Sequence, residues 1–96
     1  MEISVGSTLY GRSGERIGTV TDVINHPIDL HPEWVAVRIG VLRREHLVPV
    51  SAVEDRDGVL MTFLDDDTVK HSPVLHEHVT PTLDESAALR AHFDMN

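Results

Sequence analysis

The chain has 96 residues, of which 41% are hydrophobic and 25% charged, a composition typical of one soluble globular domain. It contains no cysteine, which excludes disulfides and cysteine-based metal or nucleophile chemistry. The net charge is −8, and ten acidic but only three basic residues lie in 49–96, which disfavours a nucleic-acid partner. The sequence has no signal-peptide pattern and no long apolar segment, so we expect a cytoplasmic protein that binds neither membrane nor nucleic acid.

The first predicted elements are a short strand over 5–10 and a bent strand over 16–25, joined by a turn. Within the second, Ile17, Val20 and Ile24 follow the helical spacing i, i+3, i+7. The many β-branched residues between them favour a strand instead. A β-bulge at Gly18–Thr19 would let Ile17 and Val20 both face inward. Such a bulge also supplies the bend that a small closed barrel requires.

The middle of the chain predicts three further strands after a proline-containing loop. Residues 34–39, WVAVRI, alternate clearly, with Val35, Val37 and Ile39 expected to face inward. A strand is predicted over 47–52, where Pro49 requires an edge or a bulge. The third, 59–64, is apolar on nearly both faces, so we expect both faces to be covered.

Turn signals and one helix signal complete the pattern. Asp57–Gly58 predicts a hairpin turn, and Asp65–Asp67 a polar turn. Thr82 to Glu85 form a capping box with Thr82 as N-cap, which predicts a helix over about 83–94. Leu89 and Phe93 lie at i, i+4 and should dock this helix on the sheet. We therefore predict one domain, 1–96, with a mainly β fold: a small, strongly bent β-barrel of five or six strands within about 4–79, and one short C-terminal α-helix.

The order of several segments resembles the PRC-barrel domain family. These are GSTLYGRSGERIGTVTDVI, WVAVRIG, HLVPVSAV, DGVLMTF and VKHSP. The matching positions are Gly14, Ile17, Gly18, Val20, Asp22, Val23, Gly40, Val48, Pro49 and Pro73. The resemblance covers about residues 3–93 and implies a small β-barrel used for docking, not for catalysis.

Members of that family include the cytoplasmic part of the photosynthetic reaction-centre H subunit and the C-terminal domain of a bacterial ribosome-maturation factor. This sequence shows neither the transmembrane helix of the first nor the second domain of the other. We therefore expect a stand-alone member that acts as a protein–protein interaction or adaptor module, with its protein partner unidentified.

Histidines offer the main alternative to that function. His71, His76 and His78 lie close in sequence, and imidazoles two apart on a strand can chelate zinc or copper. However, His71 lies beyond Pro73, and a structural zinc site needs four ligands. We expect a polar surface segment here, with no metal and no other cofactor. A histidine-based metal- or ligand-binding protein is the alternative, and seven histidines also permit a pH sensor.

No motif predicts catalytic residues. The sequence contains no G-x-S-x-G elbow and no phosphate-binding glycine loop, so we do not expect an enzyme. Trp34 is the residue most suited to partner contact, although a role in covering the end of the barrel or the helix is favoured over it. The two apolar faces of 59–64 make a homodimer plausible, since one small barrel does not easily hide both.

Overall fold

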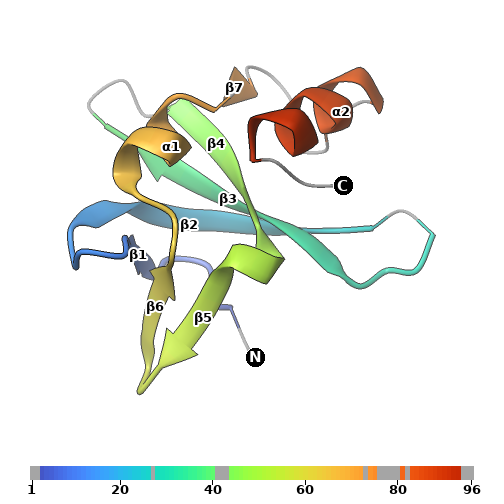
Figure 1. Cartoon of the computed structure of the whole chain (residues 1–96). Helices are drawn as coiled ribbons and strands as arrows, with labels where there is room; N and C mark the ends of the chain where they lie inside the picture. Colours follow the sequence, from blue (N-terminus) through green and yellow to red (C-terminus); the bar gives the residue numbers. More distant parts are fainter. Residues whose placement is uncertain are drawn as a thin grey trace.

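The computed structural model describes residues 3–26, 28–40, 44–72, 74–75, 81 and 83–93, and these residues form a mainly β fold (Figure 1). Seven strands make one sheet in the order β5-β6-β1-β2-β3-β4-β7. Their bounds are β1 Thr8–Tyr10, β2 Arg16–Asn25, β3 Pro32–Ile39, β4 Arg44–Pro49, β5 Val53–Arg56, β6 Val59–Thr62 and β7 Val74–Leu75. Neighbouring strands are antiparallel except β1 and β6, which run parallel. The predicted fold class is confirmed.

The sheet bends around a single inner core. Buried side chains from β1 through β6 meet in one cluster with Ala52 of the 3-10 helix η1 (Val50–Ala52) and Val69 of α1 (Asp66–Lys70). A flat sheet could not bring the side chains of strands so far apart in its order into one cluster. Among the described residues no ladder joins the edge strands β5 and β7, so side-chain packing, not strand pairing, closes the barrel.

Two bulges explain the ambiguous spacing in β2. Leu9 pairs with Gly18 and Tyr10 with Arg16, so Ile17 is an extra residue and faces inward beside Gly18. The bulge therefore lies at Ile17–Gly18, one residue before the predicted Gly18–Thr19. A second irregularity follows, because Val20 pairs with Val37 but Asp22 with Ala36. This second shift of parity sends Ile24 to the opposite face of the sheet from Val20.

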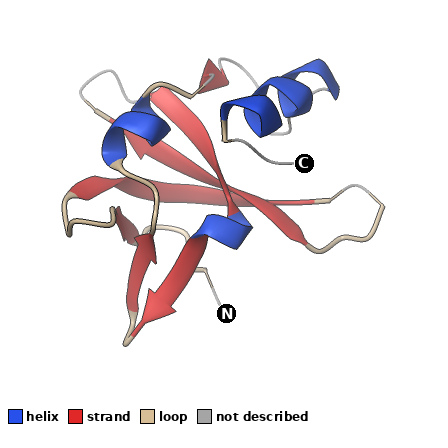
Figure 2. Ribbon diagram, viewed as in Figure 1, coloured by secondary structure: helices blue, strands red, loops and turns tan. Residues whose placement is uncertain are grey.

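Strand β3 is buried on both faces. Val35, Val37 and Ile39 enter the inner core as predicted. Trp34 and Ala36 point the other way, into an outer cluster with Ile24, Leu47 and Leu89. Leu89 belongs to α2 (Leu83–His92), which lies against this outer face with Phe93 packed beside it (Figure 2). The predicted docking by Leu89 and Phe93 is confirmed, whereas the predicted N-cap, Thr82, and the helix end at Asp94 lie outside the described residues.

The predictions for two segments in the second half of the chain are wrong. The strand predicted over 47–52 ends at Pro49, where the chain turns into η1 and then into β5, which had no sequence prediction. The turn predicted at Asp65–Asp67 is the start of α1. Asp65 is its N-cap and accepts hydrogen bonds from the backbone N–H and the hydroxyl of Thr68, at 2.9 and 2.6 Å. These bonds hold the pKa of the Asp65 carboxyl below its usual value.

The first predicted strand is shorter than expected, because the chain turns at Gly6. This glycine has a φ of 95°, and its N–H donates to the carbonyl of Val20 at 2.8 Å. A residue with positive φ cannot continue a regular strand, so β1 begins only at Thr8.

Candidate functional site

The three histidines predicted as alternative metal ligands do not form a described site. His71 is exposed after α1, and its Nδ1–H donates to the carbonyl oxygen of Asp67 at 2.8 Å. His76 and His78 lie outside the described residues. Of these three histidines the structure describes only His71, whose hydrogen bond stabilises the C-terminal end of α1.

A different histidine cluster lies in the loop between β2 and β3. His26 and His31 stack with their ring centroids 5.1 Å apart and their planes at 11°. Oδ2 of Asp29 is 3.9 Å from Nδ1 of His26 and 3.6 Å from Nδ1 of His31. Both imidazoles therefore present the same ring nitrogen to one carboxylate oxygen.

The backbone closes this loop tightly. The N–H of His26 donates to the carbonyl of His31 at 2.7 Å, and the N–H of Leu30 donates to the carbonyl of His26 at 2.9 Å. Leu30 has a φ of 60°, a left-handed conformation that a leucine rarely adopts. The backbone therefore turns sharply between Asp29 and His31 and brings the two histidines together.

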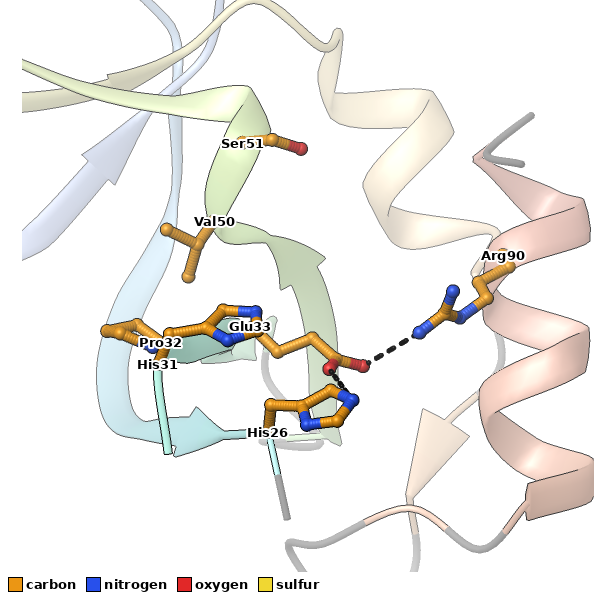
Figure 3. A pocket seen from close by; sticks show the side chains of 7 residues that line it. All are labelled: His26, His31, Pro32, Glu33, Val50, Ser51 and Arg90. Atoms are coloured by element: carbon orange, nitrogen blue, oxygen red, sulfur yellow. Dashed lines mark hydrogen bonds and ion pairs between the residues drawn. The ribbon is translucent and has the colours of Figure 1, made fainter. Parts of the chain in front are cut away.

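A carboxylate anchored by α2 faces the other side of His26. Oε1 of Glu33 accepts hydrogen bonds from the Nε1–H of Trp34 at 2.9 Å and from Arg90 of α2 at 3.2 Å. Its Oε2 lies 3.9 Å from Nε2 of His26. Figure 3 marks this contact, and the one between Glu33 and Arg90, with dashed lines. His26, Glu33 and Arg90 line an open hollow of about 390 Å³ together with His31, Pro32, Val50 and Ser51 (Figure 3).

Two other histidines, His46 and His92, connect elements of the fold through hydrogen bonds. His46 of β4 is buried, and its Nδ1 lies 2.9 Å from Oγ of Ser72. Because the Ser72 hydroxyl donates to the carbonyl of Val69 at 2.6 Å, the imidazole must donate to Ser72. His92 of α2 donates from Nε2 to the carbonyl of Thr68 at 2.6 Å, which links the two helices. Burial lowers the pKa of His46, and the charges of Arg44 and His92 lower it further.

Exposed apolar side chains lie on the β5–β6 hairpin, as they do in the β2–β3 loop, where Ile28 and Leu30 are exposed. Val59 is 43% and Phe63 66% exposed, while Leu60 and Thr62 between them are buried. The prediction that residues 59–64 are covered on both faces is therefore wrong for the single chain. Tyr10 of β1 pairs with Met61, so it shares this outer face, as do Glu54 and Arg56 of β5. We call Tyr10, Val59, Met61 and Phe63 the β6 face.

Trp34 does not take part in an exposed surface. Its side chain is 1% exposed, covered by Leu89 of α2, and its indole N–H is bonded to Glu33. The sequence left open whether Trp34 contacts a partner or packs within the fold. In the structure Trp34 packs beneath α2. No helix in the described part of the chain combines the length and apolar character needed to cross a membrane.

The family model for the PRC-barrel domain matches residues 5–69, about two thirds of the chain. The chain belongs to the PRC-barrel domain family. A search of the curated proteins found no match. The matched residues span β1 to β6 and nearly all of α1, so α2 lies beyond the matched part of this PRC-barrel.

Sequence reasoning missed the β2–β3 loop cluster. The stretch from His26 to His31 reads H-P-I-D-L-H, and the spacing of its histidines and aspartate was a usable signal. The importance of Glu33 had no such signal, because it depends on Arg90, 57 positions later in the chain.

Proposed function

We propose that this PRC-barrel is a non-catalytic, cytoplasmic docking module that binds a protein partner through the β6 face. The observation that carries this proposal is the exposure of Phe63 and Val59 next to the partly exposed Met61. Single exposed apolar residues are common, but several that lie next to one another, here along β6 and at the residue directly after it, are typical of contact surfaces. An exposed phenylalanine is also well suited to anchor an interface, because aromatic side chains dominate binding energies.

The surroundings of the β6 face support a protein partner. Glu54 and Arg56 lie opposite Met61 and Val59 on β5 and form an ion pair of 2.7 Å. They cancel each other's charge, so the β5 positions opposite the apolar residues form a polar border that is neutral at this pair, and many interfaces have a polar border. A phosphate backbone would gain little from such a surface on a chain of net charge −8.

The edge of the sheet adds a second means of contact. Within the part of the chain that the structure describes, β5 is the last strand on its side of the hydrogen-bonded order, with β6 as its neighbour. Its outer edge therefore offers backbone N–H and C=O groups to a strand from a partner. The β6 face and this edge adjoin each other on the same hairpin.

The arrangement of the histidines supports a non-catalytic role. The contact between His46 and Ser72 has the residue types of a base and a nucleophile, but the Ser72 proton goes to the carbonyl of Val69. His46 therefore donates to the hydroxyl and cannot take its proton in this geometry. In the hollow, Glu33 is already engaged by Trp34 and Arg90, which leaves it poorly placed to act as a general base.

The partner in this proposal is a second copy of the chain. A twofold contact through the β6 face would bury the same apolar residues on both copies, and the neutral border limits repulsion between two acidic chains. Light scattering after size exclusion, from micromolar to near-millimolar concentration, tests this directly. We expect a dimer for the wild type and a monomer for Phe63→Asp.

A matched control separates a specific effect from a general one. Ile28 is 83% exposed in the β2–β3 loop, so Ile28→Asp introduces the same charge at another exposed apolar position. We expect Ile28→Asp to dimerise like the wild type. A monomeric wild type would refute the homodimer. If the wild type is monomeric, and if the wild type and Phe63→Asp also retain the same partner proteins in a pull-down, docking by this face is refuted altogether.

A further inference from the structure

We propose that His26, Asp29 and His31 bind one divalent transition-metal ion, with zinc as the best-suited ion. This inference is independent of docking by the β6 face, because it concerns the loop at the other end of β2. The ligand atoms of the three residues lie within 4.8 Å of one another. Two imidazoles and one carboxylate are a donor set that zinc accepts, with water completing the coordination.

The ligand atoms lie close together, and because the two stacked imidazole rings are nearly parallel, the ring of His31 must turn toward the ion. Nδ1 of His26 and Nδ1 of His31 are 3.9 and 3.6 Å from the same oxygen, Oδ2 of Asp29. Two ligand atoms held by one tetrahedral zinc ion are roughly 3.4 Å apart, given bonds of about 2.0–2.1 Å. The two distances to Asp29 are therefore only a few tenths of an ångström wider than bound ligands require.

The exposed side chains leave room for this adjustment. The side chains of Asp29 and His31 are 63% and 56% exposed, so rotation of either meets little resistance. The side chain of His26 is only 27% exposed, so it is less free to rotate and acts as the fixed ligand of the three. Only the two mobile ligands need to close on the ion.

His26 already has the tautomer that a metal requires. The backbone N–H groups of Ile28 and Asp29 donate to its Nδ1, at 3.2 and 3.3 Å. An atom that accepts these bonds carries no proton, so in the neutral ring the proton lies on Nε2. The lone pair of Nδ1 thus faces the backbone N–H groups of Ile28 and Asp29, and a metal would compete with two long hydrogen bonds and not with a proton.

Glu33 supplies the outer partner that metal-binding histidines usually have. Its Oε2 faces Nε2 of His26 at 3.9 Å, on the side of the ring away from Asp29. Metal-ligating histidines typically donate their second N–H to a carboxylate, which orients the ring and raises its basicity. Trp34 and Arg90 hold Glu33 in position for this role from the outer cluster and from α2. Glu33 is therefore a positioning residue and not a ligand.

Isothermal titration of the untagged full chain with zinc chloride at pH 7.5 tests the site. We expect one zinc ion per chain, and we expect Asp29→Asn and His31→Ala each to weaken binding at least tenfold. Both altered residues are exposed, and circular dichroism would verify that the variants fold. His71→Ala is the matched control, because it removes an exposed histidine outside the cluster and should bind zinc as the wild type does.

A second measurement locates the ion. In ¹⁵N–¹H spectra, zinc should shift the amide signals of Ile28 and Asp29 first, because the ion takes the lone pair that accepts their bonds. The double variant His76→Ala/His78→Ala should show the same shifts as the wild type. The proposal is refuted if micromolar zinc does not bind one-to-one, if Asp29→Asn and His31→Ala bind like the wild type, or if the double variant or His71→Ala abolishes binding.

Discussion

The carbonyl oxygen of Arg38 in β3 lies where a side chain on Gly18 of β2 would begin. A Cβ atom at position 18 would collide with that oxygen and would approach Cγ1 of Val37 to 2.9 Å. Gly18 lies directly after the extra residue of the bulge against β1, and β3 passes close to it on the other side of β2. The glycine is therefore required by the close approach of a neighbouring strand, and not by a positive φ.

Gly18→Ala should destabilise the protein by about 3 kcal/mol, near the upper end for overpacking, because the obstructing atom belongs to the backbone and cannot rotate away. Urea denaturation measures this loss. Gly14→Ala is the control: its φ is 85° but nothing lies within 4 Å of the added methyl group, so about 1 kcal/mol is expected. Equal losses for the two variants would show that the close approach is unimportant.

Leu89→Ala should uncover Trp34 as well as destabilise the protein. Leu89 is fully buried in the outer cluster, and the truncation of such a leucine typically costs about 2–5 kcal/mol. Trp34 is the single tryptophan of the chain, so its fluorescence reports on the cover that α2 provides. We expect a red shift of its emission in Leu89→Ala.

Ala88→Ser provides the comparison for that experiment. Ala88 is exposed on the same helix, so the change should alter stability by less than about 0.5 kcal/mol and leave the emission unchanged. If the emission of Leu89→Ala also stayed unchanged, α2 would not be the element that shields Trp34.

The protein should lose stability as the pH falls below 6.5, in part through His46. Its pKa in the folded chain is lowered from 6.5 by burial, so the unfolded chain takes up a proton first. The contribution of His46 to the free energy of unfolding is therefore complete above pH 6.5 and declines as the pH falls. It is lost once the pH is below the pKa of His46 in the folded chain. Denaturation at a series of pH values between 8 and 4 measures this slope.

His46→Asn should flatten the pH dependence, because an amide can still donate to Ser72 but does not titrate. His71→Gln removes an exposed histidine and should leave most of the slope in place. An unchanged slope in His46→Asn would assign the acid sensitivity to other groups.

Local sequence patterns correctly predicted the elements whose backbone conformation depends mainly on their own residues. Asp57 and Gly58 both have positive φ, 54° and 85°, as the Asp-Gly signal requires of a hairpin turn. Asp65 shows the limit of such signals. A run of three aspartates suits both a solvated turn and the first turn of a helix, and the hydrogen bonds from Thr68 decide for the helix.

The candidate sites were less predictable than the fold. The apolar run 59–64 showed that β6 had more apolar side chains than a strand with one buried face needs. The sequence could not show that Phe63 stays exposed, because exposure depends on which elements cover the strand. The convergence of His26 and His31 likewise required the left-handed turn at Leu30, which no local preference of leucine favours.

The alternation of β3, the hairpin turn and the apolar positions of α2 can be read from the sequence, because each follows from the geometry of neighbouring residues. The burial of both faces of β3, the carbonyl in front of Gly18 and the link from Trp34 through Glu33 to Arg90 became evident only in the folded chain. These relationships join residues far apart in the chain. They depend on how the bulges bend the sheet and where α2 packs, which no local pattern specifies.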